Sequence, residues 1–392
     1  MFNRIIHIAM DEKFINSANW QFENAFPNKN IFFIYQYSNA IDLVHVEKSK
    51  NVNIIVTKND EDALLKSIES NDIVIFHSLQ IDFFSVILQL PEQIKCIWFC
   101  FGFEVYNDIH YFSEHRLLDK MTKKQFSILK QPFKKRIEEN IHIRSYYRLI
   151  KPQLPLSNLE IQRRTKREVM DRINYLGCGF KEEHKNITKL IGIKKNTFPF
   201  WYFPIERIVE VSDKITLEKP NILIGNSGFK TGNHLDIFNK IKNYDFGKRK
   251  IIVPLNYGDG SYINNIIELG TPIFSDKFHP LTTFFELPRY NQIIQNCGVA
   301  ILNNRRQQAV GNTIALLWHG SKVYLSKRNT FYKYLKRIGV LVFSYENDLS
   351  ESSINQLLNI DQIEYNRNIL FKNLNSEFLL NELKQKIEKV YD

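Results

Sequence analysis

The sequence has little glycine and cysteine, and it contains no long apolar run. Its 392 residues include 15 glycines and 4 cysteines, against 30 phenylalanines. The longest apolar stretches, such as Cys96–Phe103, are far shorter than the roughly 20 residues that a membrane-spanning helix needs. The N-terminus lacks the apolar core and the small-residue cleavage site of a secretory signal. We therefore expect a cytoplasmic protein with reduced cysteines and no transmembrane helix.

Several catalytic and binding motifs are also missing. The chain has no HExxH, CxxC or EF-hand spacing, no GxSxG elbow, no GxGxxG fingerprint and no P-loop, so standard NAD and ATP sites lose support. The residues Asp60-Glu61-Asp62 match the DxD pattern of a metal-binding motif. It follows Asn59 at the start of a predicted helix, where acidic residues interact favourably with the helix dipole. We expect no metal ion and no cofactor.

Positive charge is abundant but concentrated in one region. Lys and Arg number 53 and Asp and Glu 42, which gives a net charge of +11. Residues 116–168, the basic stretch, hold 15 Lys and Arg and 5 Asp and Glu, a net +10, which leaves +1 for the rest of the chain. Such a stretch suits an anionic membrane surface, a phosphorylated substrate or nucleic acid.

Short apolar runs alternate with segments of helical periodicity along the chain. In the N-terminal half the predicted strands are Arg4–Met10, Ile31–Tyr37, Asn53–Val56, Asp72–His77 and Lys95–Phe101, a unit of about residues 1–110. In the C-terminal half they are Asn221–Gly225, Lys250–Pro254, Pro272–Phe274, Val299–Leu302, Lys322–Leu325 and Val340–Phe343. Strands separated by helices form parallel βαβ units, which predicts an α/β protein.

Two such units predict two Rossmann-like domains that face a central cleft. The first covers residues 1–210 and is expected to bind the acceptor, with a basic insertion at about 116–175. The second covers residues 211–392 and ends in a helical tail. Ligands of such sheets bind at the carboxyl ends of the strands, so polar residues directly after a strand are the candidate binding residues.

In the second unit, two segments follow strands in this way. Gly225-Asn226-Ser227-Gly228 is a loop whose backbone N–H groups suit a diphosphate, although an ordinary tight turn is the alternative. Asn303–Thr313 opens a helix, whose first N–H groups bind anions, although a polar loop with an Asn cap explains it too. The candidate donor-binding residues there are Arg305 and Arg306 for phosphate, Gln307 and Gln308 for sugar hydroxyls, and Gly311, Asn312 and Thr313 at the helix start. Further donor-site candidates are Asn256, Tyr257 and Glu286, the last for ribose hydroxyls.

The first unit offers candidates for the acceptor side. Glu104 follows the most apolar strand and is our candidate general base toward an acceptor hydroxyl, with a surface carboxylate as the alternative. Gly102 and Tyr106 flank it and are expected to contact the acceptor. His77 ends a strand and is a further acceptor-binding candidate, although a structural histidine is an equal alternative.

Residues 220–340 resemble the C-terminal half of glycosyltransferase family 56, the bacterial transferases of 4-acetamido-4,6-dideoxygalactose (Fuc4NAc) in enterobacterial common antigen synthesis. The matching motifs are Ile222-Leu-Ile-Gly-Asn-Ser-Gly228, Val253-Pro-Leu-Asn-Tyr-Gly258, Glu286 with Tyr290, Arg306-Gln-Gln-Ala-Val-Gly311, and, before them, Trp98 with Gly102-Phe-Glu-Val-Tyr106 and Tyr202-Phe-Pro204. Ala309 stands where that family has Gly, and Glu104 where it has Asp. Residues 116–175 are longer and more basic than the family pattern.

The resemblance implies a GT-B fold, a dTDP-sugar donor, a polyprenyl-diphosphate-linked acceptor and a metal-free reaction in surface polysaccharide synthesis. It also implies a peripheral protein on the cytoplasmic face of the bacterial inner membrane, where the basic stretch would meet anionic lipid. In a retaining reaction, Glu104 would position the acceptor and would not act as a base.

Other interpretations remain open at this point. The donor could carry another nucleotide, or the chain could be a non-catalytic glycan-binding scaffold. A nucleic-acid-binding protein is the rival from another class, because Phe126, Phe133, Tyr146 and Tyr147 lie among the basic residues and could stack on bases. No nucleic-acid-binding motif accompanies them, and we expect no nucleic acid partner.

Overall fold

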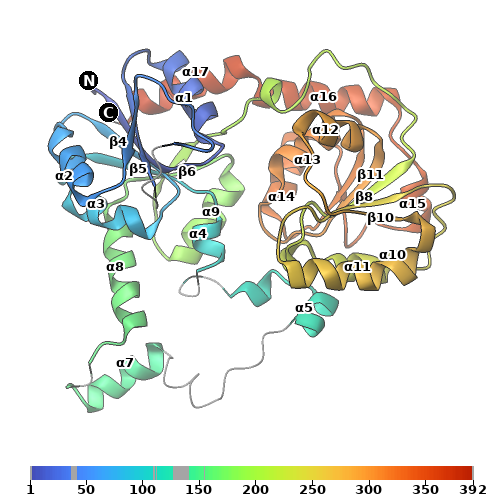
Figure 1. The fold of residues 1–392 in the computed structure, drawn as a ribbon, viewed down its shortest axis with the longest axis horizontal. Coiled ribbons are helices and arrows are strands. Elements are labelled where there is room, and N and C mark those ends of the chain that lie inside the picture. The colour runs from blue at the N-terminus through green and yellow to red at the C-terminus, as the bar shows by residue number, and fades with distance from the viewer. Residues whose placement is uncertain are drawn as a thin grey trace.

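The computed structural model describes residues 2–36, 42–108, 111, 113–126, 141–153 and 155–390. Residues 127–140 of the basic stretch, with Phe133 among them, lie outside this described part. Within it, the chain forms two parallel sheets, one from each half (Figure 1). Both sheets are covered by helices, which gives the predicted α/β architecture of two Rossmann-like units.

The first sheet has seven strands in the order β3-β2-β1-β4-β5-β6-β7, and every adjacent pair is parallel. The strands are β1 (Ile5–Met10), β2 (Asn30–Tyr35), β3 (Val52–Ile55), β4 (Ile73–His77), β5 (Lys95–Phe99), β6 (Tyr175–Cys178) and β7 (Asn196–Pro199). The helices of this half are α1 (Ile15–Ala25), α2 (Lys58–Ser67), α3 (Phe84–Gln89), α4 (Phe103–Tyr106), α5 (Lys120–Phe126), α7 (Ile141–Ile150), α8 (Asn158–Arg172) and α9 (Lys181–Ile191).

Alternate side chains of the buried strands enter different cores, as the period of two requires. In β4, Val74 and Phe76 pack with α2, α3, α8 and α9, whereas Ile73 and Ile75 pack with α1. The sheet is thus buried on both faces, which explains the continuous apolar runs in the sequence.

The first sheet reaches residue 199, whereas we expected the unit to occupy about residues 1–110. The two strands that sequence analysis missed, β6 and β7, follow the basic stretch. They have four residues each, YLGC and NTFP, and the Gly and Pro weaken the apolar pattern that reveals longer strands.

The second sheet has six strands in the order β10-β9-β8-β11-β12-β13, again all parallel. They are β8 (Asn221–Ile224), β9 (Ile251–Pro254), β10 (Phe278–Leu281), β11 (Cys297–Leu302), β12 (Lys322–Leu325) and β13 (Phe343–Ser344). Its helices are α10 (His234–Ile241), α11 (Gly260–Phe274), α12 (Leu287–Gln295), α13 (Val310–Trp318), α14 (Thr330–Ile338), α15 (Glu351–Asn355) and α16 (Ile360–Leu374). This order is the Rossmann order, whose switch point lies between the first and fourth strands, here β8 and β11.

One predicted strand is wrong. Pro272–Phe274 forms the last turn of α11, with Pro272 inside the helix, and the third strand of this sheet begins only at Phe278. Proline at this position suggested the end of a helix, but burial of Phe274 in the core between α10 and α11 keeps the last turn helical.

The C-terminal helices connect the two halves. Helix α16 packs against α13 of the second unit, whereas α17 (Ser376–Glu388) packs against α1, and its Leu383 and Ile387 enter the core of the first sheet. Figure 1 shows both helices along one side of the molecule. The domain boundary at residues 210 and 211 stays a prediction.

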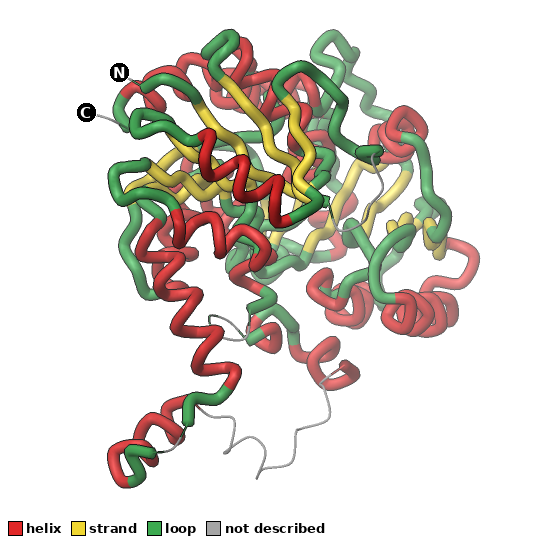
Figure 2. Tube along the Cα trace, turned by 60° about the vertical axis from the view of Figure 1, so that its left-hand side comes forward, coloured by secondary structure: helices red, strands yellow, loops and turns green. Residues whose placement is uncertain are grey.

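The basic stretch is inserted between β5 and β6 and takes two different courses. Helix α5 packs against α10 of the second unit, whereas α8 packs against α3 of the first. Figures 1 and 2 show α7 at the far end of α8, projecting away from both sheets. No helix among the described residues is long and apolar enough to cross a membrane.

Candidate functional site

The switch point of the second sheet brings together the two polar loops that follow β8 and β11. Gly225 has a positive φ of 71°, and a Cβ there would lie 2.1 Å from Nε2 of His234. The N–H group of Gly225 donates to the carbonyl of Ile301 at 3.0 Å. A glycine is therefore required at position 225, because the backbone has a positive φ and a side chain would clash with the buried His234 ring. The N–H group of Gly225 is already bonded and does not bind a ligand.

Gly228 has a similar steric role, because a Cβ there would lie 2.3 Å from Cγ1 of Ile263. A Cβ on Gly258 would lie 2.3 Å from the backbone of Gly228, so the loops after β8 and β9 cross at two glycines. The N–H group of Gly228 donates to the carbonyl of Tyr257 at 2.7 Å. The predicted diphosphate cradle at Gly225–Gly228 is therefore reduced to the N–H groups of Asn226 and Ser227, for which no backbone partner is present among the described residues.

Unpartnered polar atoms gather beside these loops. The side-chain Oδ1 atoms of Asn226, Asn303 and Asn304 are buried and have no hydrogen-bond partner among the described residues. Their side-chain NH₂ groups do have partners, which are Ser227 Oγ, Asp119 and the carbonyl of Thr231, respectively. Buried polar atoms are nearly always paired in native proteins. Three open acceptors at one sheet edge therefore indicate a place where a ligand supplies the missing donors.

The start of α13 faces the same edge. Its N-cap residue, Ala309, has φ 55° and ψ 36°, the left-handed conformation that favours glycine. The helix begins at Val310, one residue earlier than predicted, so the N–H group of Thr313 already donates to the carbonyl of Ala309 at 2.8 Å. The unsatisfied N–H groups are consequently those of Val310, Gly311 and Asn312. A Cβ on Gly311 would meet no atom within 4 Å, so there is open space beside this helix start.

Other predicted donor residues lie around this edge with different degrees of exposure. Gln308 accepts from Thr231 Oγ1 at 3.1 Å, and its NH₂ group lies 3.5 Å from Ser227 Oγ. Asn312 donates to the hydroxyl of Tyr290 at 3.3 Å. Gln307 and Asn256 are half-buried, Tyr257 is exposed, and Glu286 is an exposed residue at the N-cap of α12.

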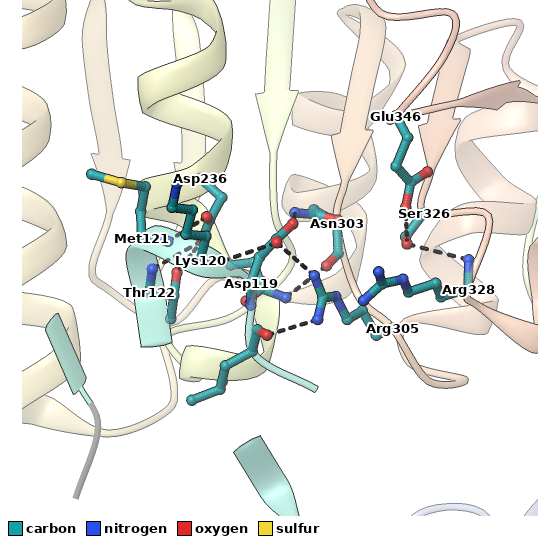
Figure 3. A network of polar contacts seen from close by, with 12 residues as sticks. Asp119, Lys120, Met121, Thr122, Asp236, Asn303, Arg305, Ser326, Arg328 and Glu346 are labelled. Carbon is teal, nitrogen blue, oxygen red and sulfur yellow. Dashed lines mark hydrogen bonds and ion pairs between the residues drawn. The ribbon is translucent and has the colours of Figure 1, made fainter. Parts of the chain in front are cut away.

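Arg305 is bound to the basic stretch (Figure 3). Its Nη2 lies 2.5 Å from Oδ1 of Asp119, and its Nη1 donates to the carbonyl of Leu118 at 2.7 Å. Burial opposes ionisation of Asp119, but the hydrogen bond from Asn303 and the charge of Arg305 lower its pKa. Arg305 thus holds the start of α5 and has little capacity left for a donor phosphate.

Two further residues of the second unit hold the same segment. Asp236 accepts from the N–H groups of Met121 and Thr122 at 2.7 and 3.0 Å, and thereby caps the N-terminus of α5 from another helix, as Figure 3 shows. Asn233 accepts from the N–H group of Asp119 at 2.7 Å and donates to the carbonyl of Leu117 at 2.9 Å. Asp119 was not among the predicted site residues, although it is the first acidic residue of the basic stretch.

Arg306 differs from Arg305 because no carboxylate among the described residues forms an ion pair with it. Its Nε, like that of Arg305, is buried without a partner among the described residues, and its hydrogen bond to the carbonyl of Gln307 is long at 3.4 Å. The guanidinium lies over the ring of Tyr106 at 5.6 Å, and its Nη1 would be 3.9 Å from a Cβ on Gly102. Burial lowers the pKa of Arg306, while Tyr106, Glu183 and Glu104 favour its charged form. Arg306 is therefore a half-buried cation that reaches from the second unit to the edge of the first.

Glu183, which sequence analysis missed, connects the two units beside Arg306. It lies in the first turn of α9, and its Oε1 accepts from the hydroxyl of Tyr106 at 3.0 Å. Its Oε2 accepts from the hydroxyl of Thr330 at the start of α14. Burial raises the pKa of Glu183, although these hydrogen bonds oppose the shift. Because Asn186 also donates to the Tyr106 hydroxyl at 2.6 Å, this hydroxyl is occupied, and the ring of Tyr106 is what faces Arg306.

Glu104 lies in the short helix α4, directly after the positive-φ residue Gly102. Its Oε1 accepts from Trp98 Nε1 and from the N–H group of Phe101, both at 3.0 Å. Its Oε2 is buried and has no partner among the described residues. Burial raises the pKa of Glu104 above its ordinary value. A fixed carboxylate with one open oxygen and a raised pKa is suited to accept a proton, and its role as a base stays a prediction.

His77 is buried and uses both ring nitrogens. Its Nε2 lies 3.0 Å from Nδ1 of His7, and its Nδ1 lies 2.7 Å from the hydroxyl of Tyr202. Burial lowers the pKa of His77 to about 3, so the ring is neutral. No ring nitrogen is left for an acceptor, and the structural alternative is the one that fits this geometry.

The rejected metal motif has the expected position. Asp60 and Glu61 lie in the first turn of α2, where Asp60 forms a capping box with Thr57. In the described part of the chain, no three His, Cys, Asp or Glu side chains gather closely enough to hold a metal ion.

Comparison with protein families identifies the C-terminal half. Residues 193–380 match the family described as 4-alpha-L-fucosyltransferase, glycosyl transferase group 56. This range contains the loops after β8 and β11, the start of α13 and both arginines of the site.

Comparison with solved structures concerns the whole chain. A UDP-forming trehalose-phosphate synthase from Burkholderia xenovorans is similar with a TM-score of 0.61, 10% identity and 100% coverage of both chains. An E. coli trehalose-6-phosphate protein bound to UDP-2-fluoro glucose gives a TM-score of 0.61 at 9% identity, covering 98% of each chain. The N-terminal domain of a Candida albicans trehalose-6-phosphate phosphatase gives 0.62 at 10% identity, over 100% of this chain and 97% of that one. At such identities the likeness shows the fold, which is GT-B.

Proposed function

The chain is a GT-B glycosyltransferase whose residues 193–380 match glycosyl transferase group 56, and from this premise we propose its donor and acceptor. The donor is a dTDP-linked deoxy-amino sugar of the Fuc4NAc type. The acceptor is a glycan carried on a polyprenyl diphosphate, used in surface polysaccharide synthesis. The basic stretch supports an anionic, lipid-linked acceptor, because its net charge of +10 suits an anionic partner.

One observation carries the donor assignment. Open buried acceptors on Asn226, Asn303 and Asn304 lie at the switch point of the second sheet, beside a helix start with free N–H groups. The nucleoside and sugar supply donors that the asparagines lack. The free N–H groups of α13 favour the negative diphosphate, because the helix dipole is positive at this end.

Arg306 completes the diphosphate site in this proposal. It is a half-buried cation whose buried Nε lacks a partner among the described residues, and negative charge on the leaving dTDP would supply one. A fixed cation and fixed N–H groups stabilise charge that develops on the leaving diphosphate without reorganisation during the reaction. Arg305, which the sequence nominated equally, is assigned to holding α5.

Glu104 serves the acceptor in this proposal. Its open Oε2 accepts the hydrogen bond of the acceptor hydroxyl, and in an inverting reaction it takes the proton as the hydroxyl attacks the sugar. In a retaining reaction the same hydrogen bond positions the hydroxyl. Gly102, directly before α4, has a positive φ of 98°, a backbone conformation that favours glycine.

The substrate assignment is tested with purified protein and a panel of dTDP-, UDP- and GDP-sugars. Donor hydrolysis and transfer to a lipid-linked acceptor are followed by release of the nucleoside diphosphate. We expect dTDP-Fuc4NAc to be used at least about tenfold more efficiently than UDP or GDP donors, because the site is proposed to recognise the nucleoside. Preference for a UDP- or GDP-sugar would mean that the enzyme is a GT-B glycosyltransferase with a different nucleotide-sugar donor. No turnover with any donor would favour the glycan-binding scaffold.

A further inference from the structure

The apolar residues of α7 form an exposed surface at the end of the projecting arm. Tyr146, Leu149 and Ile150 are 67%, 79% and 67% exposed, and Leu156 just beyond the helix is 43% exposed. We call these four residues the α7 tip. Figures 1 and 2 show α7 at the far end of α8, away from both sheets. Contiguous exposed apolar residues of this kind mark an interaction surface.

The opposite side of α7 is fixed to the protein. Arg144 Nε and Arg148 Nη2 lie 2.9 and 2.7 Å from the two carboxylate oxygens of Glu160, in the first turn of α8. Burial opposes ionisation of Glu160, but its hydrogen bonds to Ser157 and to both arginines lower its pKa to about 2. Residues 144 and 148 share one face of a helix, and residues 146, 149 and 150 share the other. The two ion pairs hold the arginine face of α7 against the start of α8, so the residues of the α7 tip lie on the outer face of the helix.

Charge around the α7 tip indicates the partner. Residues 141–172 contain 8 Lys and Arg and 3 Asp and Glu, a net charge of +5. Lys151 directly follows the helix and is exposed, as are Arg163 and Arg164 on α8. An amphipathic helix with apolar residues outward and basic residues around it suits the interface of an anionic bilayer, where acyl chains and phosphate headgroups match both features.

We propose that the α7 tip inserts into the interface of an anionic lipid bilayer and holds the enzyme where its acceptor lies. This inference deepens the proposed function and rests on it for the acceptor alone, because lipid binding can be measured without any sugar. Insertion contributes binding beyond electrostatic attraction, so part of the binding withstands high salt. The bilayer is also the partner that a polyprenyl-linked acceptor requires.

Vesicle flotation tests the inference directly. The full chain is mixed with phosphatidylcholine vesicles with and without phosphatidylglycerol, at low and high salt. We expect wild type to bind the anionic vesicles and Leu149→Glu with Ile150→Glu to bind them at least about tenfold more weakly. The matched control, Ile360→Glu with Phe378→Glu, adds the same charges at exposed apolar residues of α16 and α17 and is expected to bind like wild type. Equal weakening in both double variants would overturn the inference, since charge alone would then explain it.

Two further measurements define the mode of binding. Leu149→Trp is expected to show a blue-shifted emission on anionic vesicles relative to the wild-type background, and no shift would overturn insertion. If sedimentation velocity shows a dimer that Leu149→Glu with Ile150→Glu dissociates, while vesicle binding is unchanged, the tip binds a second copy and the inference is wrong.

Activity separates this inference from the proposed function. The Leu149→Glu and Ile150→Glu variant is expected to transfer sugar normally to a short water-soluble acceptor and poorly to an acceptor embedded in vesicles. Wild-type protein that binds vesicles through the tip but transfers no sugar would refute the proposed function and leave the tip assignment standing. Circular dichroism melting confirms that the variants are folded.

Discussion

The carboxyl edges of the two sheets differ in how their polar groups are satisfied. At the first sheet, the ring nitrogens of His77 and both oxygens of Glu183 are bonded to protein groups, whereas Glu104 Oε2 has no partner among the described residues. At the second sheet, several atoms lack partners among the described residues, namely Asn226 Oδ1, Asn303 Oδ1, Asn304 Oδ1, His234 Nε2, Arg305 Nε and Arg306 Nε. The second edge is therefore suited to a large polar ligand, whereas the first offers a single proton acceptor. This division matches a nucleotide-sugar on one side and one acceptor hydroxyl on the other.

Removal of Arg306 is expected to have the largest effect. Arg306→Ala deletes the proposed cation at the leaving diphosphate, so kcat/KM for the donor should fall by roughly 10²–10³. The measurement is steady-state kinetics over donor concentration. Arg306→Lys is expected to recover little, because a single ammonium does not reproduce the guanidinium fork.

Arg328→Ala is the matched control for Arg306→Ala. Arg328 is exposed at the same sheet edge, and only its backbone N–H group takes part in the contacts with Ser326 (Figure 3). Its removal is expected to change kcat/KM less than about twofold. Equal losses in the two variants would mean that general positive charge, and not the position of Arg306, matters.

Glu104→Gln tests the first edge. If Glu104 is the base, kcat should fall by about 10²-fold, the lower end of what a positioned base contributes, while donor affinity stays unchanged. Near-normal turnover in this variant would exclude the base and leave a positioning role.

The pH dependence of activity sharpens this test. Burial raises the pKa of Glu104, so the carboxylate becomes an effective base only above that raised value. As the pH is lowered, wild-type kcat/KM is expected to begin to fall at a pH above the range in which ordinary carboxyl groups titrate. The Glu104→Gln variant should not show this fall.

Stability of the same variant should respond in the opposite direction. The raised folded-state pKa means that the protonated form stabilises the fold at low pH and that this contribution is lost as pH rises through the raised pKa. Gln mimics the protonated form. Thermal melting at neutral pH should therefore show Glu104→Gln at least as stable as wild type, and a clear loss of stability would contradict the assigned environment.

The contact between Asp119 and Arg305 is expected to give an intermediate effect on stability. Asp119→Ala and Arg305→Ala each remove a charge-assisted contact that holds α5, with a loss of roughly 1–3 kcal/mol in the free energy of unfolding. The double variant should lose little more than either single one, because both act through the same pair. Additive losses measured by chemical denaturation would mean that the two residues act independently.

Ala309→Gly is expected to give the smallest effect. Ala309 has a left-handed backbone conformation, in which glycine avoids the strain that alanine carries. The free energy of unfolding should rise by roughly 0.5–1 kcal/mol, measured by chemical denaturation. A loss of stability would mean that the side chain of Ala309 packs more favourably than its backbone strain costs.

Much of the fold was predictable because strands of a parallel sheet that is buried on both faces appear in the sequence as continuous apolar runs. The runs containing β1, β4, β5, β8 and β11 were all predicted as strands, and the match to GT-B structures confirms the predicted fold class. The missed β6 and β7 are short and interrupted by Gly177 and Pro199. They are stabilised by neighbours that are distant in sequence, which local pattern does not reveal.

The site was less predictable because its assignment depends on contacts between the units. Arg305 and Arg306 are adjacent in sequence and chemically identical. Asp119 forms an ion pair with Arg305, whereas no carboxylate among the described residues pairs with Arg306. Asp119 lies 186 residues earlier than Arg305, so only the fold distinguishes the two. Likewise the sequence indicated Gly225 and Gly228 as diphosphate-binding residues, whereas the structure shows that a side chain at these positions would meet His234 and Ile263.

Calorimetric titration of dTDP and of thymidine into wild type and Arg306→Ala tests the central claim most directly. Wild type is expected to bind dTDP much more tightly than thymidine, because the diphosphate adds the contacts with Arg306 and the start of α13. In Arg306→Ala the advantage of dTDP over thymidine should shrink by at least about tenfold, with thymidine affinity unchanged. An unchanged advantage of dTDP in this variant would contradict the assignment of the second edge as the diphosphate site.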